Sequence, residues 1–171
     1  DSVQDTKKIK VKFNIDLDIP SQYEYVMRRK NFIWLKKEIT SGNASLVIYQ
    51  VPYKSIHNYN TVNDIVRTRD SIGKLYIHAK GNRARMLTEE AYFPYFSKIK
   101  FNDYNVFETK GTWQMNNDFM SGPFINYAIK DKANNRILIL EGFCYAPSKE
   151  KRDLMFELES IIKTIRIPKK Q

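Results

Sequence analysis

Apolar residues occupy every second position between residues 8 and 19, and only Lys, Asn and Asp lie between them. The alternating apolar residues are Ile9, Val11, Phe13, Ile15, Leu17 and Ile19. A period of two predicts a strand over residues 8–19 with one buried and one solvated face. Pro20 should end this strand, because proline cannot donate a hydrogen bond to a ladder, and residues 20–31 are predicted to be a connection.

Two β-hairpins are predicted from apolar segments that flank polar turns. The predicted pairs are residues 31–40 with 44–52, around Ser41-Gly42-Asn43, and residues 124–131 with 136–145, around a turn of Asp, Lys, Ala and Asn. The last of these segments is almost unbroken apolar, which is typical of a central strand that is covered on both faces.

The stretch between the two hairpins is less regular. Residues 101–115 are predicted to be strand, interrupted around Lys110-Gly111. Residues 76–96 are predicted to be a long loop that holds one strand. A helix precedes this loop over residues 61–75, where Thr61 can cap the first turn and Asp64 suits the helix dipole.

A second helix is predicted near the C-terminus, where Ser148 can act as its cap. Its apolar residues form a wide stripe that must lie on the sheet. They are Leu154, Met155, Leu158, Ile161, Ile162 and Ile165. Together the elements predict an α+β fold: a mainly antiparallel sheet of about five to seven strands, with two or more helices and the C-terminal helix packed on the sheet.

Length and composition agree with this fold class. A chain of 171 residues fits one domain, and we expect residues 1–171 to form a single α+β domain. Hydrophobic residues make up 42% of the chain and aromatic residues 13%, which excludes a disordered protein. No apolar run is long enough to span a membrane.

Positive charge is the unusual feature of the composition, with a net charge of +10. Such a charge attracts polyanions but does not select among them. Cations cluster at Arg28–Lys30, Lys36-Lys37, Arg83 with Arg85, and Lys98 with Lys100, with aromatic residues interleaved. Aromatic residues beside cations can bind single-stranded nucleic acid, but the solvated faces of amphipathic strands explain most of these cations and are the favoured interpretation.

The sequence lacks GxGxxG, P-loop, HExxH, GxSxG and EF-hand motifs, so it predicts no cofactor and no metal site. One cysteine, Cys144, leaves no internal disulfide, and its apolar surroundings favour a buried strand residue over a reactive thiol. His57 and His78 are favoured as surface or loop residues over a metal-binding pair.

Glu141 is the most unusual acid, because it lies inside the apolar segment before Gly142. A lone buried charge is costly, so this carboxylate should be paired, and Lys151-Arg152 at the start of the last helix could supply the partner. A structural ion pair is favoured over catalysis. The catalytic alternative is a hydrolase that uses Asp118 or Glu141 with Arg152, which requires these side chains to converge on one point.

The segment NDFMSGPFINY, residues 117–127, raises a similar choice. Gly122 permits a close backbone approach, Pro123 fixes its own φ, and aromatic residues surround both. Ligand grooves are often aromatic with few polar groups, so a binding loop is one interpretation. A corner between two strands is the other, and composition alone favours the corner.

The chain resembles an uncharacterised family of Bacteroidetes lipoproteins, known as a domain of unknown function, over most of residues 10–167. The positions that carry the likeness are Phe32, Trp34, Leu35, Arg69, Asp70, Ser71, Gly111, Trp113, Asp118, Met120, Gly122, Pro123, Phe124, Arg136, Glu141, Gly142, Phe143, Tyr145, Ala146, Pro147, Lys151, Arg152, Leu158 and Glu159. The order of elements more weakly resembles PsbP-like α/β/α sandwiches, which are mostly binding or assembly modules.

This resemblance implies a location but no activity and no catalytic residues. An N-terminal signal and a lipidated cysteine would tether such a protein to the cell envelope. Family members are longer, so residues 1–171 are expected to be the C-terminal or mature portion of a lipoprotein.

The favoured hypothesis is a non-enzymatic envelope module that binds a protein or a polyanionic partner through residues 113–124 and the neighbouring aromatic side chains. The predicted binding residues are Trp113, Asp118, Met120, Gly122, Pro123, Phe124, Glu141, Tyr145 and Arg152. The hydrolase described above is the first alternative, and a polyanion-binding or nucleic-acid-binding domain is the second.

Overall fold

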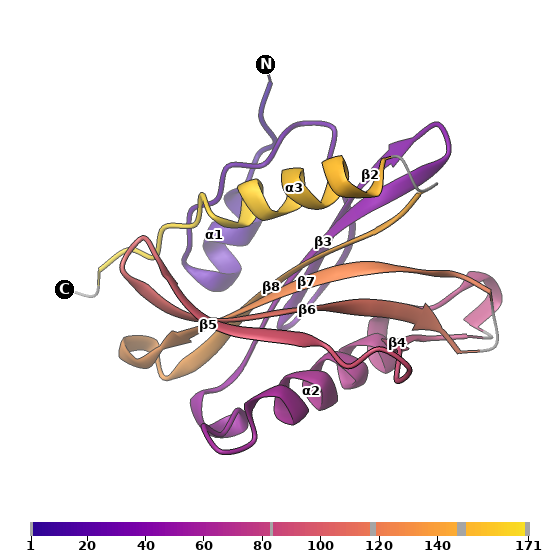
Figure 1. The fold of residues 1–171 in the computed structure, drawn as a ribbon. Helices are drawn as coiled ribbons and strands as arrows, with labels where there is room; N and C mark the ends of the chain where they lie inside the picture. Colours follow the sequence, from indigo (N-terminus) through magenta and orange to yellow (C-terminus); the bar gives the residue numbers. More distant parts are fainter. Residues whose placement is uncertain (1, 83, 117–118, 147–149, 170–171) are drawn as a thin grey trace.

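An antiparallel sheet of eight strands forms the centre of the computed structural model, which describes residues 2–82, 84–116, 119–146 and 150–169 (Figure 1). The strands are β1 Glu24–Arg29, β2 Phe32–Ile39, β3 Gly42–Pro52, β4 Met86–Thr88, β5 Tyr95–Phe101, β6 Tyr104–Met115, β7 Ser121–Asp131 and β8 Arg136–Tyr145. The α-helices of the described residues are α1 Lys7–Phe13, α2 Thr61–Tyr76 and α3 Lys151–Ile162. The α+β class and the C-terminal helix on the sheet are confirmed.

The strand order is β1-β2-β3-β8-β7-β6, and β4 and β5 both pair with the outer side of β6. Strand β8 therefore lies in the middle, between β3 and β7. All of its residues are buried except Tyr145. The prediction of a central strand covered on both faces is confirmed, because only such a strand can bury both parities of its side chains.

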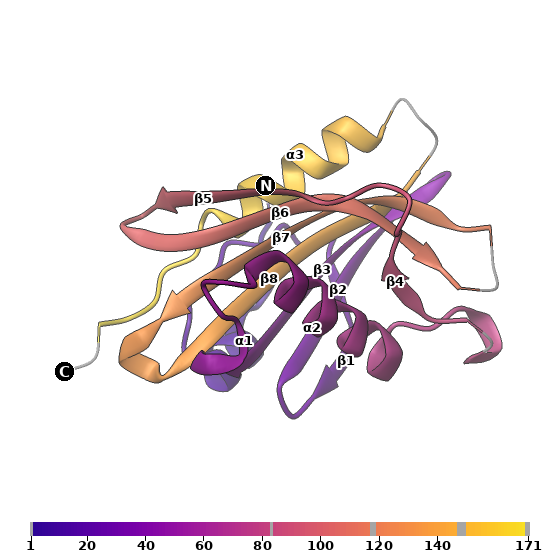
Figure 2. The same cartoon turned by 60° about the horizontal axis from the view of Figure 1, so that its bottom comes forward.

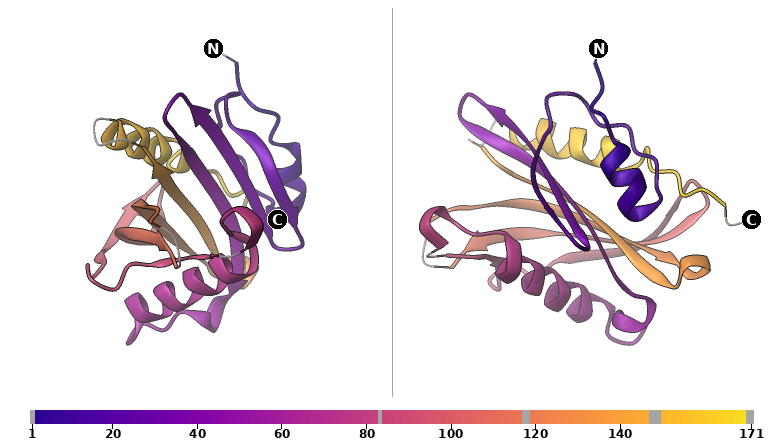
Figure 3. Two further views of the ribbon diagram at one scale, coloured as in Figure 1. Left: turned by 90° about the vertical axis from the view of Figure 1, so that its right-hand side faces the viewer. Right: turned by 180° about the vertical axis from the view of Figure 1, so that it is seen from behind.

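Two hydrophobic cores lie on the two faces of the sheet (Figures 2 and 3). On the α3 face, α1 and α3 pack against the sheet and Leu158 lies at the centre. On the α2 face, α2 and β4 cover a core that holds Trp113 and Phe124. Neighbouring residues of β8 alternate between these two faces.

The strand predicted over residues 8–19 is wrong in its first half, where α1 forms. Ile9 and Phe13 are buried but Val11, between them, is 78% exposed. Residues four apart share a face in a helix and in a strand alike, so the pattern could not separate the two. Asn14 ends α1 with a left-handed φ of 55°, and alternate burial resumes through Ile19.

Strands β1 and β5 were missed, which is why the sheet has more strands than the predicted five to seven. β1 lies within the predicted connection of residues 20–31, and β5 begins within the predicted loop. Both lie at edges of the sheet and leave many side chains exposed, so their apolar pattern is weak. The predicted break at Lys110-Gly111 is also wrong, since β6 continues through it, paired with β7.

Both predicted hairpins are confirmed, as β2–β3 and β7–β8. Ile39 pairs with Gly42, so the first turn consists of Thr40 and Ser41, and Gly42 belongs to β3. Helix α2 matches its prediction within one residue, and Asn60 is the residue at its cap. The predicted cap Ser148 lies outside the described residues. No helix among the described residues is long and apolar enough to cross a membrane.

Candidate functional site

Trp113 and Gly122 form a packed corner between β6 and β7. The Trp113 side chain is buried, and its Nε1 donates a hydrogen bond of 3.0 Å to the carbonyl oxygen of Cys144 in β8. A Cβ atom at Gly122 would lie 2.1 Å from that oxygen and 2.8 Å from Trp113 Nε1. Glycine is therefore required here by a close approach of backbone and indole, and this end of the segment supports the fold.

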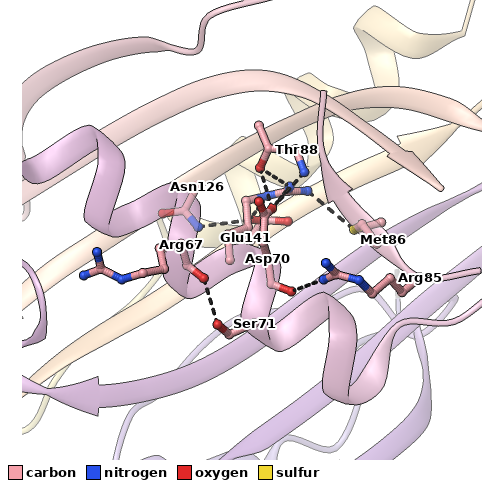
Figure 4. A network of polar contacts seen from close by, with 9 residues as sticks. Arg67, Asp70, Ser71, Arg85, Met86, Thr88, Asn126 and Glu141 are labelled. Atoms are coloured by element: carbon pink, nitrogen blue, oxygen red, sulfur yellow. Dashed lines mark hydrogen bonds and ion pairs between the residues drawn. The ribbon is translucent and has the colours of Figure 1, made fainter. Parts of the chain in front are cut away.

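Glu141 lies in a buried polar network between α2 and the sheet (Figure 4). Its Oε1 accepts hydrogen bonds from Arg69 Nε at 2.7 Å and from Asn126 Nδ2 at 3.0 Å. The Arg69 guanidinium also donates to Thr88 Oγ1 at 2.8 Å and stacks 3.7 Å from the centre of the Phe124 ring. Each of these side chains is buried, so the network joins α2, β4, β7 and β8 in one unit.

The predicted pairing of Glu141 with Lys151 or Arg152 is wrong. Glu141 points to the α2 face, whereas its neighbour Gly142 faces Leu158 of α3. Adjacent residues of a strand point to opposite faces, so α3 cannot supply the partner. Arg69, 72 positions earlier in the chain, supplies it instead. Glu141 therefore forms a structural ion pair as predicted, but with Arg69 instead of Lys151 or Arg152.

A groove on the α3 face lies beside the packed corner, between the first half of α3 and strands β6 and β7. One hollow, of about 380 Å³, is lined by Thr112, Ser121, Gly122, Pro123, Lys151, Arg152 and Met155. A second hollow of about 330 Å³ shares Pro123, Arg152 and Met155 with the first, and extends along α3 past Phe156. We call the two hollows together the α3 groove.

The α3 groove is positively charged and partly apolar. The side chains of Lys151 and Arg152 make no ion pair or hydrogen bond within the described part of the chain. The acid at the far end is Glu159, whose carboxylate binds Lys163 at 2.9 Å. Burial opposes its ionisation, but hydrogen bonds from Lys163 and Tyr127 and the charges of Lys163 and Lys110 together outweigh this effect and lower the pKa of Glu159. The groove therefore presents unpaired cations beside a carboxylate that is already neutralised.

Exposed aromatic side chains continue this surface. Phe156 is 70% exposed on α3, and Tyr95 is 69% exposed at the start of β5. Tyr95 pairs with Lys110, which lines the groove, and cross-strand partners share a face of the sheet. Tyr92 and Phe93, just before β5, are exposed as well. Phe156 and Tyr95 thus expose large apolar side chains at this groove.

The structure divides the predicted binding residues into two groups. Gly122, Pro123, Phe124 and Arg152 line the α3 groove, although Phe124 turns its ring to the opposite core. Among the others, Trp113 and Glu141 are buried and Met120 is half-buried. Tyr145 is 38% exposed, and its ring centre lies 6.4 Å from that of Trp113. Asp118 lies outside the described residues.

Sequence reasoning missed Lys110, Met155 and Phe156 as groove residues. Met155 was assigned to the buried stripe of the last helix, but it is half-buried at the edge of that stripe. Phe156 was the available signal, because it is a large apolar residue on the polar side of an amphipathic helix. Lys110 could not be assigned without knowing that β6 runs beside α3.

The remaining titratable candidates have structural partners. His57 Nδ1 lies 2.8 Å from the buried carboxylate of Asp64 in the first turn of α2. Burial raises the pKa of Asp64, but hydrogen bonds from His57 and Arg67 outweigh it and lower the pKa to about 2. Cys144 is buried as predicted, and this burial raises the pKa of its thiol to about 11. No group of His, Cys, Asp and Glu among the described residues could hold a metal ion.

The family model for a domain of unknown function, DUF4837, matches residues 2–164. The chain belongs to this family. The resemblance to a domain of unknown function is thus confirmed, while the Bacteroidetes and lipoprotein parts of that resemblance stay predictions. A search of curated proteins finds no match.

A solved structure is similar to this fold. It is the solution structure of cyanobacterial PsbP (CyanoP) from Synechocystis sp. PCC 6803, with a TM-score of 0.59 and 8% sequence identity. The similarity covers 98% of this chain and 93% of that chain. At this identity the likeness shows a PsbP-like fold, as expected from the order of elements, and nothing about function.

Proposed function

We propose that this chain is a non-enzymatic binding module that holds an extended segment of a partner protein in the α3 groove. The observation that carries the proposal is the combination of unpaired Lys151 and Arg152 with the exposed side chain of Phe156 along one groove. Grouped apolar side chains on a surface mark interaction sites more often than isolated ones do. The unpaired cations favour a partner segment that carries Asp or Glu beside apolar residues.

The structure of the groove also favours binding over chemistry. Glu141 and Arg152 were the proposed catalytic pair, and they lie on opposite faces of the sheet. They cannot converge on a common substrate atom, which general acid–base catalysis requires. Asp118, the other acid of that hypothesis, lies outside the described residues.

We further propose a location in the cell envelope, where an N-terminal lipid would tether the protein. The support is the resemblance to the lipoprotein family over most of the chain, including Gly111, Trp113 and residues 122–124. Fractionation of cells that express the complete gene tests this proposal. Recovery of the protein in the membrane fraction, with loss of that attachment when the predicted lipidated cysteine is replaced, is the expected result, and recovery with the cytoplasmic proteins would contradict it.

Selection of short random peptides displayed on phage tests the binding proposal. We expect the enriched peptides to combine Asp or Glu with aromatic or aliphatic residues. Their affinity, measured by fluorescence anisotropy, should fall about tenfold or more in the double variant Arg152→Glu/Phe156→Ser, because both a cation and an apolar contact are lost.

A matched control uses α2, on the other face. Lys74→Glu/Leu75→Ser makes the same change in charge and removes a side chain that is 61% exposed, so it should leave the affinity unchanged within about twofold. Equal losses in the two variants, or no enrichment of acidic and apolar peptides, would contradict the proposal.

A further inference from the structure

Four lysines surround another hollow, of about 710 Å³, which is separate from the α3 groove and lies on the α2 face of the sheet. They come from the exposed edge strand β5 and from the β7–β8 hairpin. The lysines are Lys98, Lys100, Lys130 and Lys132. We call this site the lysine hollow. The strand register places it at the end of β6 and β7 opposite to the α3 groove. A ligand in the lysine hollow would not depend on the function proposed for that groove.

Aromatic side chains line the lysine hollow and fix one of its cations. The Lys130 ammonium lies 5.9 Å from the centre of the Tyr53 ring and 5.5 Å from that of Phe107. It also lies 3.5 Å from the amide oxygen of Asn58. A cation held over two ring faces is attracted by both quadrupoles, so Lys130 is positioned before any ligand arrives.

The other lysines of the hollow have no counter-charge. No Asp or Glu lines it, and the side chains of Lys98, Lys100 and Lys132 form no ion pair or hydrogen bond with any described residue. Several lysines elsewhere on this chain are paired with acids, as Lys37 is with Glu157 at 2.6 Å. Four positive charges around one hollow repel one another, and a bound anion would relieve this repulsion.

We propose that the lysine hollow binds a small, multiply charged anion with phosphate or sulfate groups. Lysine ammonium groups are mobile point charges with three donors each, which suits tetrahedral anions better than it suits a single planar carboxylate. Lys98, Lys100 and Lys132 bind the charged groups, and Tyr53 presents a ring face to the organic part of the ligand. The volume is within the range of small-molecule sites.

The arrangement of charge argues for a compact anion and against a nucleic-acid strand. A bound strand needs a track of cations along one face. The next large group of cations, around Lys7, Lys8 and Arg28–Lys30, lies at β1, at the other edge of the sheet from β5. These two groups do not form one continuous track.

Calorimetric titration with sodium tripolyphosphate tests the proposal, together with NMR signals of the Tyr53 and Phe107 rings. The test variant is Lys98→Gln/Lys100→Gln/Lys132→Gln, and the control is Lys7→Gln/Lys8→Gln/Lys30→Gln. All six lysines are exposed, and both variants remove three positive charges. We expect binding to weaken about tenfold or more in the test variant and to stay within about twofold in the control.

A second arm separates a free ligand from a lipid headgroup. The same proteins are mixed with phosphatidylcholine vesicles, with and without phosphatidylglycerol, and the bound fraction is measured by flotation. Binding that depends on phosphatidylglycerol and is lost only in the test variant assigns the anion to a headgroup, whereas binding of tripolyphosphate alone assigns it to a free ligand. Equal losses in both variants, or no binding in either arm, overturn the proposal.

Discussion

Glu141 and Gly142 are adjacent in β8, and each contacts a helix on a different face of the sheet. Glu141 joins the Arg69 network on the α2 face, and Gly142 receives α3 on the other face. No ligand is needed to explain why Glu141 and Gly142 stand at these positions. A buried carboxylate and a glycine in the most buried strand are each accounted for by the partner that they contact.

The Arg69–Glu141 pair predicts strong coupling between two substitutions. Glu141→Leu should destabilise the protein by about 3–5 kcal/mol, because it removes the closest counter-charge of the buried Arg69 guanidinium and leaves only Asp70, whose Oδ1 is 3.9 Å away. Arg69→Met/Glu141→Leu should cost less than Glu141→Leu alone, since no buried charge remains and the apolar side chains fill similar volumes. Urea denaturation followed by circular dichroism measures both. A double variant at least as unstable as Glu141→Leu would contradict this account.

At the scale of elements, the position of α3 depends on the absence of a side chain in β8. A Cβ atom at Gly142 would lie 2.7 Å from the Cβ atom of Leu158, so Gly142→Ala should push α3 from the sheet at a cost of about 1–3 kcal/mol. Leu158→Gly removes the Cβ atom that the added methyl group would meet, so in that background the same substitution should cost much less. Thermal denaturation of the four proteins tests this, and an equal cost in both backgrounds would show that α3 does not depend on this contact.

How far the elements could be predicted depended on burial. The β8 segment and both central hairpins were clear from sequence, because fully or half-buried strands show strong apolar patterns. The edge strands β1 and β5 were not, because neither strand contains a fully buried residue. Helix α1 was mistaken for a strand because Ile9 and Phe13 satisfy both periodicities.

The candidate site was predictable only in part for a related reason. Gly122 and Pro123 were selected for their backbone properties and Arg152 as a possible partner of Glu141, and the three residues do line one groove. Their common location follows from α3 packing beside β7, which involves residues about 30 positions apart. No local pattern of the sequence encodes such a contact. Glu141 was selected as an acid inside an apolar segment and Trp113 as an aromatic residue near Gly122, and both residues serve the fold instead.

At the scale of the whole molecule, the positive charge is divided between separate surfaces. The α3 groove and the lysine hollow lie on opposite faces and at opposite ends of β6 and β7. Other cations are paired with acids, as Lys37 is with Glu157 and Arg136 is with Asp131. The net charge of +10 is therefore a sum of local sites, which is why the total charge alone could not indicate which ligand is bound.

This separation predicts that ligands bind to the two surfaces independently. Coupling between sites requires an element with two arrangements that both ligands bias, whereas the strands that join these sites, β6 and β7, are paired with each other along their length. Direct electrostatic coupling is weak as well, because salt screens exposed charges beyond about 8 Å at physiological ionic strength. Saturating tripolyphosphate should therefore change the affinity of a selected peptide for the α3 groove by less than about twofold, measured by fluorescence anisotropy. Lowering the salt concentration should enlarge any residual effect if that effect is electrostatic. A large change in affinity that does not depend on salt would instead reveal a conformational link across the sheet, and the description of β6–β8 as a rigid support would have to be replaced.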